Sequence, residues 1–501
     1  MPHHDLVVLG AGSGNTVIDG SFADRDVAII EHGAFGGTCL NVGCIPTKMF
    51  AYTAYTAYTA DTAEQVRGAG TYGLDADLRG VRWDDIRDRV FDRLNRVASS
   101  GRDHRLRDPN VTTYLGDARF TGPRALRVER ADGSGHDDVT ADRIVLAAGA
   151  RPLVPEPVEA SGVPFETSDT IMHLPGPPAR LAVLGGGYIA AEFAHIFAEL
   201  GSAVTLIEMT DQLLGGQDET VAEAFTDLAR RRYDVRLGRE VVGVDGEGDE
   251  VWITLDDGAV VVTDLLLVAV GRIPNGDRLD LAKAGVDVHD DGRVVVDGRQ
   301  YTSADGVLAL GDISSPVQLK HVANRQARVV AHNLLHPDDP WETDLDAVPA
   351  AIFTSPGIAS VGRTEQSCRD DGLDYAASVR PYSDTAYGWA MEDRTGFCKV
   401  LAERGTGRLL GAHLLGPQAA TLIQPLVVAL SCGIDARTLA RRPYWIHPAL
   451  TEVVENAVLD LGPVNNPCGA AGSNVCSTHD EFADRRPGRP RREGPRRVDH
   501  R

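Results

Sequence analysis

The sequence predicts an α/β protein with two doubly wound domains, each built on a parallel sheet, followed by a smaller α+β domain. Its 501 residues suit about three domains of roughly 100 to 200 residues each. The same succession of apolar strand, glycine turn and helical pattern occurs near residue 10 and again near residue 185. From Ala347 onward the strands have mixed polarity instead, which is typical of a largely antiparallel sheet.

The first strand, residues 5–9, opens into a glycine-rich turn and then into a helical pattern. The candidate ligand-binding residues of this turn are Gly10, Gly12, Gly14 and Asn15. Such glycines let a pyrophosphate approach the backbone at a helix N-terminus. The next strand, residues 26–30, ends at Glu31, and an acid at that place accepts hydrogen bonds from a ribose. Because Asn15 replaces the last glycine of the G-x-G-x-x-G pattern, this turn alone does not exclude an ordinary glycine turn.

The same pattern recurs in the second domain. Strand 180–184 runs into a second turn, and strand 203–207 ends at Glu208. The candidate ligand-binding residues of this turn are Gly185, Gly187, Tyr188 and Ala190. Two complete dinucleotide fingerprints in one chain imply two nucleotide ligands.

Further apolar strands, each stopped by a glycine, extend the two parallel sheets at 144–151, 265–275 and 306–312. Strands that are apolar on both faces and alternate with helices indicate a parallel, doubly wound architecture. The third domain is expected to contain strands at 396–402 and 408–415. We place the first domain at 1–150 and 273–345, the second at 151–272, the third at 346–461, and a disordered tail at 462–501.

The charge of the chain restricts its partners. The 72 acidic residues are 50 Asp and 22 Glu, whereas the 50 basic residues are 46 Arg and 4 Lys, for a net charge of -22. A phosphate backbone would meet a negative field, so we expect no nucleic-acid partner. An Asp-rich surface with almost no Lys indicates adaptation to high salt; GC-rich coding bias explains the arginines but not the excess of Asp. No apolar run is long enough to span a membrane, so we expect a cytoplasmic protein without a membrane partner.

Two cysteines, Cys39 and Cys44, are separated by four residues in a glycine-rich segment that continues to Lys48. This spacing lets the first turn of a helix bring the sulfurs together, and a helix N-terminus with a nearby lysine favours a thiolate. We interpret them as a redox-active pair. A buried structural disulfide is disfavoured in a cytosolic chain, and no metal site is expected, because zinc would need further closely spaced Cys or His ligands.

Two other segments stand out. A threefold Tyr-Thr-Ala repeat places Tyr52, Tyr55 and Tyr58 along one helical stripe, which either packs internally or faces a substrate or a second subunit. Near the end of the third domain, His447 precedes a proline and is followed by Glu452. Taken alone, such a histidine is more often a turn or capping residue. Histidine nevertheless titrates near the pH that thiol–disulfide exchange requires of a proton donor.

The segment GGTCLNVGCIPTK, bracketed by the two fingerprints, resembles the flavoprotein pyridine nucleotide-disulfide oxidoreductases over about residues 5–460. The resemblance implies FAD in the first fingerprint and NADPH or NADH in the second. It also implies a third domain that forms the interface of a homodimer. Thr38 and Asp312 join the FAD site, with Asp312 contacting the ribityl chain. Gly271 and Arg272 join the nicotinamide nucleotide site.

The same resemblance assigns roles in catalysis. Cys44 lies against the flavin as the charge-transfer thiolate, while Cys39 exchanges with the substrate disulfide. Lys48 stands near flavin N5 and pairs with Glu192, and Tyr188 gates the nicotinamide pocket. In the H-P-x-x-x-E element of this family, which residues 447–452 match, the second subunit contributes the acid–base catalyst His447 and the glutamate that orients it, Glu452.

Within the family the phrases GAGSGNTVID, AYGWAMED and YWIHPALTEVVENAVL are most similar to those of mycothione reductases. The high-salt composition favours a different substrate, bis-γ-glutamylcystine, because salt-loving organisms use γ-glutamylcysteine and their reductase resembles the same subfamily. We expect that substrate, with mycothione disulfide as the near rival. Dihydrolipoamide dehydrogenase and a flavin electron carrier without disulfide turnover are the further alternatives. Cys468 and Cys476 are read as incidental tail residues.

The nucleotide preference is predicted from the end of the second fingerprint's strand. Glu208 ends this strand, and no basic residue follows until Arg230. Glu208 would hydrogen-bond a free ribose 2′-hydroxyl and repel a 2′-phosphate. We therefore expect NADH to be used at least as well as NADPH, although the glutathione and mycothione reductases that the chain resembles are expected to prefer NADPH.

Overall fold

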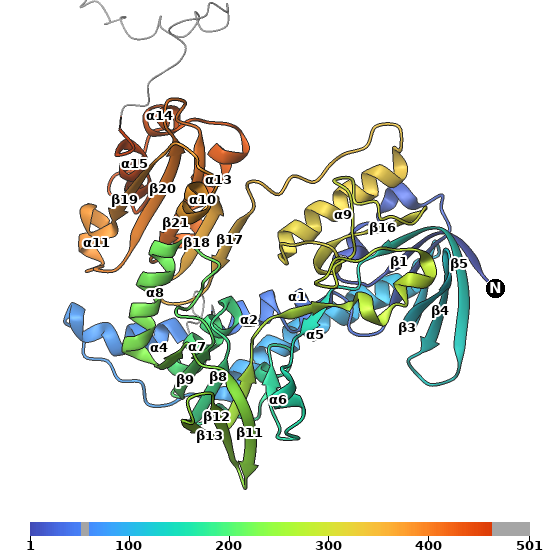
Figure 1. The fold of residues 1–501 in the computed structure, drawn as a ribbon, viewed down its shortest axis with the longest axis horizontal. Helices are drawn as coiled ribbons and strands as arrows, with labels where there is room; N and C mark the ends of the chain where they lie inside the picture. The colour runs from blue at the N-terminus through green and yellow to red at the C-terminus, as the bar shows by residue number, and fades with distance from the viewer. Residues whose placement is uncertain (52–59, 463–501) are drawn as a thin grey trace, which may run out of the picture.

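The computed structural model describes residues 1–51 and 60–462, which form three sheet-centred domains (Figure 1). It confirms the predicted fold class: two domains contain parallel sheets and the third contains an antiparallel sheet. The tyrosine repeat and the predicted disordered tail beyond Gly462 lie outside the described residues. No helix in the described part is long and apolar enough to cross a membrane.

The first domain is built on parallel strands in the order β3-β2-β1-β5-β16, and β4 joins β3 to β5 in an antiparallel extension. These strands are β1 (His3–Leu9), β2 (Val27–Glu31), β3 (Val111–Gly122), β4 (Ala125–Arg130), β5 (His136–Leu146) and β16 (Val307–Ala309). Because β16 comes from beyond the second domain in sequence, the first domain is made from two separate parts of the chain. Its α-helices are α1 (Gly37–Asn41), α2 (Cys44–Ala51), α4 (Ala60–Gly68), α5 (Trp83–Arg107) and α9 (Lys320–Leu335).

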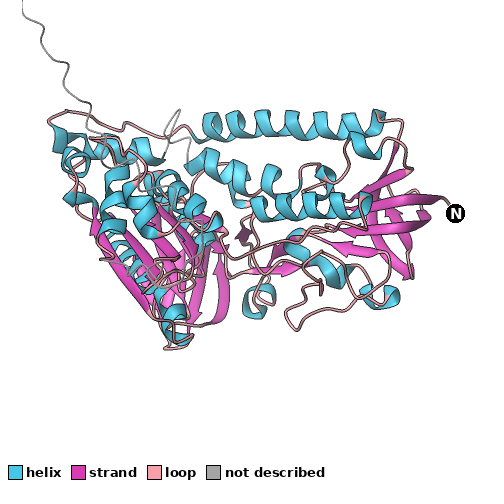
Figure 2. Cartoon of the chain, turned by 90° about the horizontal axis from the view of Figure 1, so that it is seen from above, coloured by secondary structure: helices cyan, strands magenta, loops and turns pink. Residues whose placement is uncertain are grey.

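Short 3-10 helices complete this domain. They are η1 (Gly14–Thr16), η2 (Gly20–Phe22), η3 (Ala69–Tyr72), η5 (Asn275–Arg278), η6 (Leu281–Ala284) and η7 (Gly311–Ile313). Figure 2 shows the long helices lying along the sheets, with the N-terminus at the outer edge of the first domain.

The second domain contains a wholly parallel sheet in the order β10-β9-β8-β14-β7. A separate antiparallel sheet, β11-β12-β13, stands beside it. The strands are β7 (Glu166–Thr167), β8 (Arg180–Leu184), β9 (Ala203–Glu208), β10 (Asp234–Leu237), β11 (Val241–Glu247), β12 (Glu250–Leu255), β13 (Val260–Thr263) and β14 (Leu265–Val268). The helices are α6 (Glu156–Glu159), η4 (Ile171–His173), α7 (Tyr188–Glu199) and α8 (Glu219–Arg232).

A two-stranded antiparallel ribbon connects the first two domains. It pairs β6 (Ala150–Pro152) with β15 (Arg272–Pro274). The chain leaves the first domain through one strand and returns through the other, and both expected domain boundaries, 150/151 and 272/273, fall on this ribbon.

The third domain contains the antiparallel sheet β17-β18-β21-β20-β19. Its strands are β17 (Pro349–Ile352), β18 (Ile358–Gly362), β19 (Tyr375–Pro381), β20 (Phe397–Glu403) and β21 (Leu409–Leu415). Its helices are α10 (Glu365–Asp370), η8 (Tyr382–Asp384), α11 (Ala386–Ala390), α12 (Ala419–Leu422), α13 (Gln424–Ser431), α14 (Ala436–Arg441) and α15 (Thr451–Leu459).

The mixed polarity expected for β20 and β21 does not mean that these strands are half exposed. Both are almost entirely buried, including Lys399 at 1% and His413 at 1% exposure. Burial of Lys399 is possible because its ammonium pairs with Asp218, at 2.7 Å, and with Glu365, at 2.6 Å. Asp218 is the N-cap of α8, so this charge cluster also fastens the second domain to the third.

The helix expected after the first glycine turn is absent, which corrects the sequence prediction. Only η1 and η2 lie between β1 and β2. Arg105 of α5 explains part of this, because its guanidinium donates to the carbonyl oxygens of Asn15, at 3.0 Å, and Ile18, at 2.7 Å, which a continuous helix would use internally. Asp19 then caps a new turn at the backbone N–H of Ser21.

Candidate functional site

The cysteine segment begins on two glycines that pack against the first glycine turn. Gly36 and Gly37 both have positive φ, 97° and 63°, a region that glycine adopts without strain. The N–H of Gly36 donates to the carbonyl of Ala11 at 2.9 Å. A Cβ on Gly37 would lie 2.8 Å from the Cα of Gly12, so only glycine allows this approach. The contact sets α1, which carries Cys39, directly on the first fingerprint.

Cys39 lies within α1, and Cys44 is the first residue of α2. Both are free thiols in the structure and hydrogen-bond to each other. This hydrogen bond, together with the charge of Lys48, lowers the pKa of Cys44 to about 7 against the opposing effect of burial. The same bond and burial raise the pKa of Cys39. The pair therefore has one thiolate near neutral pH, at Cys44, with its proton donor beside it.

Lys48 makes the expected contact with Glu192. Its ammonium donates to both carboxylate oxygens, at 2.7 and 2.6 Å. Glu192 is 3% exposed and also accepts the N–H of Phe353 at 3.0 Å. The ammonium lies 4.8 Å from the centre of the Phe353 ring. This ion pair thus joins α2 of the first domain, α7 of the second and the end of β17 in the third.

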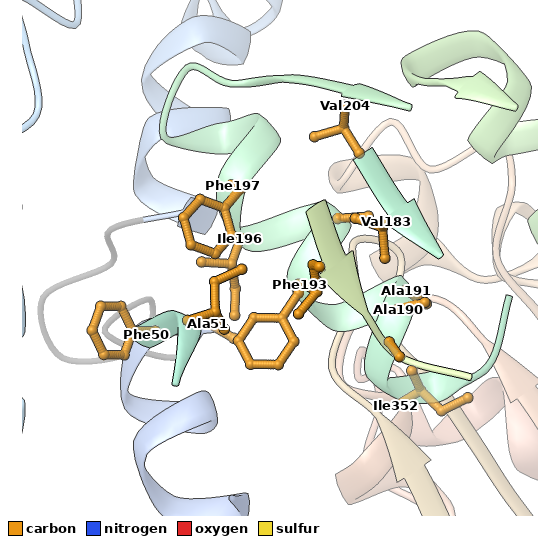
Figure 3. Close-up of a cluster of buried hydrophobic side chains, with 14 of the residues drawn as sticks. Phe50, Ala51, Val183, Ala190, Ala191, Phe193, Ile196, Phe197, Val204 and Ile352 are labelled. Atoms are coloured by element: carbon orange, nitrogen blue, oxygen red, sulfur yellow. The ribbon is translucent and has the colours of Figure 1, made fainter. Parts of the chain in front are cut away.

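An apolar cluster supports the same junction. Phe50 and Ala51, at the end of α2, lie beside the side chains of α7, with Val183 of β8 and Val204 of β9 behind them (Figure 3). Ile352 of β17 reaches the cluster from the third domain. Because each of these residues is buried, the position of Lys48 relative to α7 is held by close packing as well as by charge.

The first glycine turn is held against the neighbouring strands. Gly10 has φ 107°, and a Cβ there would lie 2.3 Å from the carbonyl oxygen of Ala147. Glu31 accepts the N–H of Ala11 at 2.6 Å and that of Gly33 at 2.7 Å. The Asn15 side chain accepts a hydrogen bond from Arg105 Nε at 2.7 Å. Asn15 therefore helps to hold the turn in place. Its direct contact with a ligand remains a prediction.

The second glycine turn leads into a full helix. Gly185 has φ 115°, and a Cβ there would lie 2.5 Å from the carbonyl oxygen of Ala269. Gly187 is the N-cap of α7 and Tyr188 is its first residue. A Cβ on Gly186 would lie 2.8 Å from Glu208 Oε2, so the carboxylate is directly beneath the turn. Ala190 is fully buried in the first turn of α7, where it packs rather than faces outward.

The remaining predicted nucleotide residues lie near the connecting ribbon. Gly271 has φ 148°, and Arg272 Nη2 donates to the carbonyl of Ala150 at 2.6 Å. Burial raises the pKa of Asp312, and the charges of Arg272 and Lys320 oppose that rise. Thr38 is half-buried in α1, and its carbonyl accepts the N–H of Val42 at 3.0 Å. The structure therefore sets Arg272 and Asp312 close enough to influence each other electrostatically.

His447 and Glu452 meet at the start of α15. His447 Nδ1 lies 2.6 Å from Glu452 Oε1, which orients the ring and leaves Nε2 outward. The His447 side chain is 72% exposed, against 19% for Glu452. Within the described part of one chain, no hydrogen bond or ion pair joins this couple to the cysteine segment.

Comparison with known proteins decides the family. Residues 4–327 match the pyridine nucleotide-disulphide oxidoreductase family, and residues 348–458 match the dimerisation domain of the same oxidoreductases. The chain belongs to this family. It is thus an NAD(P)H-dependent, FAD-containing disulfide oxidoreductase with a redox-active disulfide.

Several relatives of this oxidoreductase match along nearly their full length. A mycothione reductase of Mycobacterium tuberculosis is 50% identical over 474 residues, which cover 92% of this chain and 100% of the relative. A dihydrolipoyl dehydrogenase of Halobacterium salinarum is 32% identical over 471 residues, covering 90% and 95%. The solved structure of the HOCl-induced flavoprotein disulfide reductase RclA from Escherichia coli has a TM-score of 0.79 at 27% identity, covering 91% of this chain and 99% of that one.

Both glycine turns of the oxidoreductase fit nucleotide cofactors. Ser13 at the N-cap of η1 and Gly187 at the N-cap of α7 make no side-chain capping bond, so the first-turn N–H groups are open toward phosphate oxygens. Each turn is followed by a strand that ends in a carboxylate, Glu31 or Glu208.

Sequence reasoning missed two cations of this oxidoreductase that support its redox site. Arg105, only 7% exposed, holds the first turn, and Lys320 donates to Ser13 Oγ at 2.8 Å. No local motif marks Arg105, because its partners are about 90 residues away in sequence. Lys320 did carry a signal: it is one of only 4 lysines in a chain with 46 arginines, where a retained lysine indicates a special requirement.

Proposed function

We propose that the enzyme reduces the disulfide of a low-molecular-weight thiol through the Cys39–Cys44 pair, with His447 of a second subunit as the proton donor. The observation that carries this proposal is the thiol pair itself. One member, Cys39, lies on α1, the helix set against the first glycine turn. The pKa of its partner Cys44, the first residue of α2, is lowered to about 7 by the hydrogen bond with Cys39 and by Lys48, which pairs with Glu192. Such a thiolate is competent for exchange at physiological pH.

We assign FAD to the first fingerprint and NAD(P)H to the second. Bound there, the two cofactors would supply hydride transfer and the two electrons that reduce the Cys39–Cys44 disulfide. The open N–H groups after Ser13 and Gly187 would hold the two pyrophosphates, and Glu31 and Glu208 would bind the adenosine riboses. Tyr188, 44% exposed at the start of α7, is free to cover the nicotinamide pocket.

The residues then complete the exchange in two substitutions. His447 Nε2 first takes the proton of the Cys39 thiol, and the Cys39 sulfur attacks one sulfur of the substrate, which forms a mixed disulfide and expels the other half as a thiolate. This thiolate then takes the same proton back from His447. Glu452 holds Nδ1 and stabilises the charged ring. The Cys44 thiolate next attacks the sulfur of Cys39, which re-forms the Cys39–Cys44 disulfide and expels the second half of the substrate as a thiolate. This thiolate takes up its proton from solvent.

The substrate is proposed from two observations that favour different disulfides. The relative that is 50% identical over 92% of this chain is named a mycothione reductase, which favours mycothione disulfide. The acidic, lysine-poor composition favours bis-γ-glutamylcystine, a disulfide expected in salt-adapted cells. The identity extends over the whole length, including the third domain, so we rank mycothione disulfide first and retain bis-γ-glutamylcystine as the second candidate.

A substrate panel tests this ranking. NAD(P)H oxidation by the purified enzyme would be measured with mycothione disulfide, bis-γ-glutamylcystine, glutathione disulfide and lipoamide, at low and multimolar salt. We expect kcat/KM for one of the first two to exceed the others by at least about 100-fold, because specific polar contacts discriminate on that scale. A best rate with lipoamide would instead identify a dihydrolipoamide dehydrogenase, and flavin reduction without any disulfide turnover would identify an electron carrier.

Serine variants of the two cysteines test their division of roles. The two-electron-reduced enzyme should show a thiolate-to-flavin charge-transfer band, which Cys44→Ser abolishes and Cys39→Ser retains while disulfide reduction stops. Since the pKa of Cys44 is lowered to about 7, the band in the native enzyme should be full above that pH and fade as the pH falls below it. The opposite pattern in the two variants would show that the roles are exchanged.

Hybrid dimers test the contribution of the second subunit. Cys39→Ser and His447→Ala subunits should each be inactive alone, because the first lacks the exchanging thiol and the second lacks the proton donor. After mixing and subunit exchange, part of the activity should return in dimers that contain one intact site. If exchange is demonstrated by mass spectrometry and no activity returns, the site is not shared between subunits.

A further inference from the structure

Lysine is used in this chain at selected positions only. The chain has 50 basic residues, of which 4 are lysines. Three of the lysines form ion pairs: Lys48 with Glu192, Lys283 with Asp280, and Lys399 with Asp218 and Glu365. Lys320 differs from them, because within the described residues it has no carboxylate partner within ion-pair distance and donates to a neutral hydroxyl instead.

The position of Lys320 connects it to the redox segment. Lys320 is the first residue of α9, and its Nζ donates to Ser13 Oγ at 2.8 Å. Ser13 in turn donates to Asn324, one turn further along α9, at 3.3 Å. The glycine turn that contains Ser13 also supports α1, through the 2.9 Å bond between Gly36 and Ala11. The ammonium of Lys320 is therefore fixed on the loop against which the Cys39 helix packs.

The charged groups around the cysteine pair leave this ammonium uncompensated. Lys48 and Glu192 face the pair together and largely offset each other. Lys320 acts on Cys39 from the α9 side and lowers the pKa of that thiol, against the hydrogen bond with Cys44 and burial, which raise it. The charge of Lys320 also acts to lower the pKa of Asp312, which burial raises, and the charge of Arg272 acts on the same carboxyl group in the same direction as Lys320. The net charge that Lys320 brings to the site is thus positive.

We propose that Lys320 is a positioning residue of the redox reaction: its ammonium, held by Ser13, stabilises the negative charge that reduction brings to Cys39 and to the adjoining flavin site. Reduction of the disulfide by two electrons creates two sulfur anions for at most two protons, so a fixed cation favours the reduced pair. This inference rests on the proposed function of Cys39 and Cys44.

The experiment compares Lys320→Met, which removes the charge, with Lys320→Arg, which keeps it. Lys283→Met serves as the control, since Lys283 is exposed and pairs with Asp280. Each substitution is made in the FAD-loaded Cys44→Ser enzyme, so that the titration belongs to Cys39 alone. Iodoacetamide labelling of Cys39 is followed by mass spectrometry over a range of pH. A second set, with both cysteines intact, is titrated against a redox dye, and FAD content is measured throughout.

We expect the labelling midpoint of Cys39 to rise by about one pH unit in Lys320→Met, and to stay near that of the parent in Lys320→Arg and Lys283→Met. In the intact set, Lys320→Met should disfavour the reduced enzyme about tenfold, which is about 30 mV for a two-electron couple. If Lys320 had a purely structural role, a Met variant that retains FAD should have the same redox potential as the parent. A shifted potential in Lys320→Met, with a normal potential and FAD content in Lys320→Arg, therefore indicates an effect of charge.

Three results would overturn the inference: no change of midpoint or potential in Lys320→Met, an equal change in Lys320→Arg, or an equal change in Lys283→Met. If Lys320→Met loses FAD, the test rests on Lys320→Arg. A tenfold change of the redox equilibrium in Lys320→Arg would contradict the role of charge, because this variant keeps the charge. Failure of the proposed function looks different. It would appear in the parent enzyme, as absent disulfide turnover or an absent charge-transfer band, before any lysine is changed.

Discussion

The two glycine turns begin alike and end differently. Gly10 and Gly185 have nearly the same φ, 107° and 115°, and each lies against a carbonyl oxygen of the neighbouring strand. The second turn starts α7, a helix of 12 residues, whereas the first yields η1 and η2, of 3 residues each. Two turns with nearly the same backbone geometry are therefore followed by helices of different length.

The difference lies in what satisfies the backbone after the turn. In α7 the helix satisfies its own carbonyl groups, and its apolar residues pack on β8 and β9. After the first turn, the guanidinium of Arg105, from α5, donates hydrogen bonds to the carbonyl oxygens of Asn15 and Ile18 instead. A distant side chain thus replaces a local helix, and the phosphate-facing N–H groups remain open in both cases.

The largest expected effect comes from adding one methyl group to either turn. In Gly10→Ala the Cβ would lie 2.3 Å from Ala147 O, and in Gly185→Ala 2.5 Å from Ala269 O, each with a positive φ as well. We expect Gly10→Ala to be purified without FAD and therefore inactive. Gly185→Ala should retain FAD but lose reduction by NAD(P)H, as measured by absorbance at the flavin band.

The matched controls are Gly20→Ala and Gly216→Ala, where a Cβ would meet nothing within 4 Å. Both control variants should keep their flavin and at least about half of the native rate, because surface changes of this kind cost little. Loss of FAD from Gly185→Ala, or its retention in Gly10→Ala, would contradict the assignment of the two turns to the two cofactors.

These turns also show what the sequence could and could not predict. The strands, the glycines and the terminal carboxylates follow from local pattern, and so does the fold class, because buried strands between glycine turns have few alternatives. The missing helix could not be predicted, since the contact that explains part of its absence comes from Arg105, about 90 residues away in sequence. Propensity is a weak prior, and a tertiary contact overrode it.

In the third domain, too, contacts between residues far apart in sequence could not be predicted. The sequence predicted two strands of mixed polarity here, but their almost complete burial did not follow from it. Lys399 can be buried because Asp218 and Glu365, from other elements, pair with its ammonium. For the candidate site, the contacts between Lys48 and Glu192 and between His447 and Glu452 were expected from the resemblance to the family. The supporting cations Arg105 and Lys320 were not, since their partners lie far away in sequence.

A smaller effect is expected from Arg105→Met, which acts on the first turn alone. The substitution leaves the carbonyls of Asn15 and Ile18 without their guanidinium partner, at a cost of roughly 1 to 3 kcal/mol for each group left unsatisfied. We expect FAD to bind about 10 to 100 times more weakly, with NAD(P)H affinity unchanged, as measured by fluorescence titration of the apoenzyme and by kinetics at saturating FAD.

Arg107→Met is the matched control, because Arg107 is exposed in the same last turn of α5. It should bind FAD as the native protein does. An equal loss in both variants would mean that the charge of the helix end matters rather than the bonds to the turn. A weaker affinity for NAD(P)H in Arg105→Met would mean that the two turns are not independent.

The smallest expected effect concerns the carboxylates that end the two strands, Glu31 and Glu208. Glu31 accepts one hydrogen bond at each carboxylate oxygen, from the N–H groups of Ala11 and Gly33. Glu208 is half-buried and accepts the N–H of Thr210 at 2.8 Å from one oxygen, while the other faces Gly186. Glu208 is therefore the acid that a bound adenosine ribose would meet in the second domain.

A 2′-phosphate at that position would be repelled by Glu208, so we expect the native enzyme to use NADH at least as well as NADPH.

Glu208→Gln keeps the shape of the side chain and removes its charge. It should raise kcat/KM for NADPH relative to NADH about tenfold at low salt, equivalent to about 1.4 kcal/mol, and by less at multimolar salt because exposed charges are screened. Glu31→Gln, as the control, should change FAD retention without changing the nucleotide preference. A strong native preference for NADPH at every salt concentration would show that more distant basic residues, not the strand-end acid, select the nucleotide, and the likeness between the two turns would then stop at their glycines.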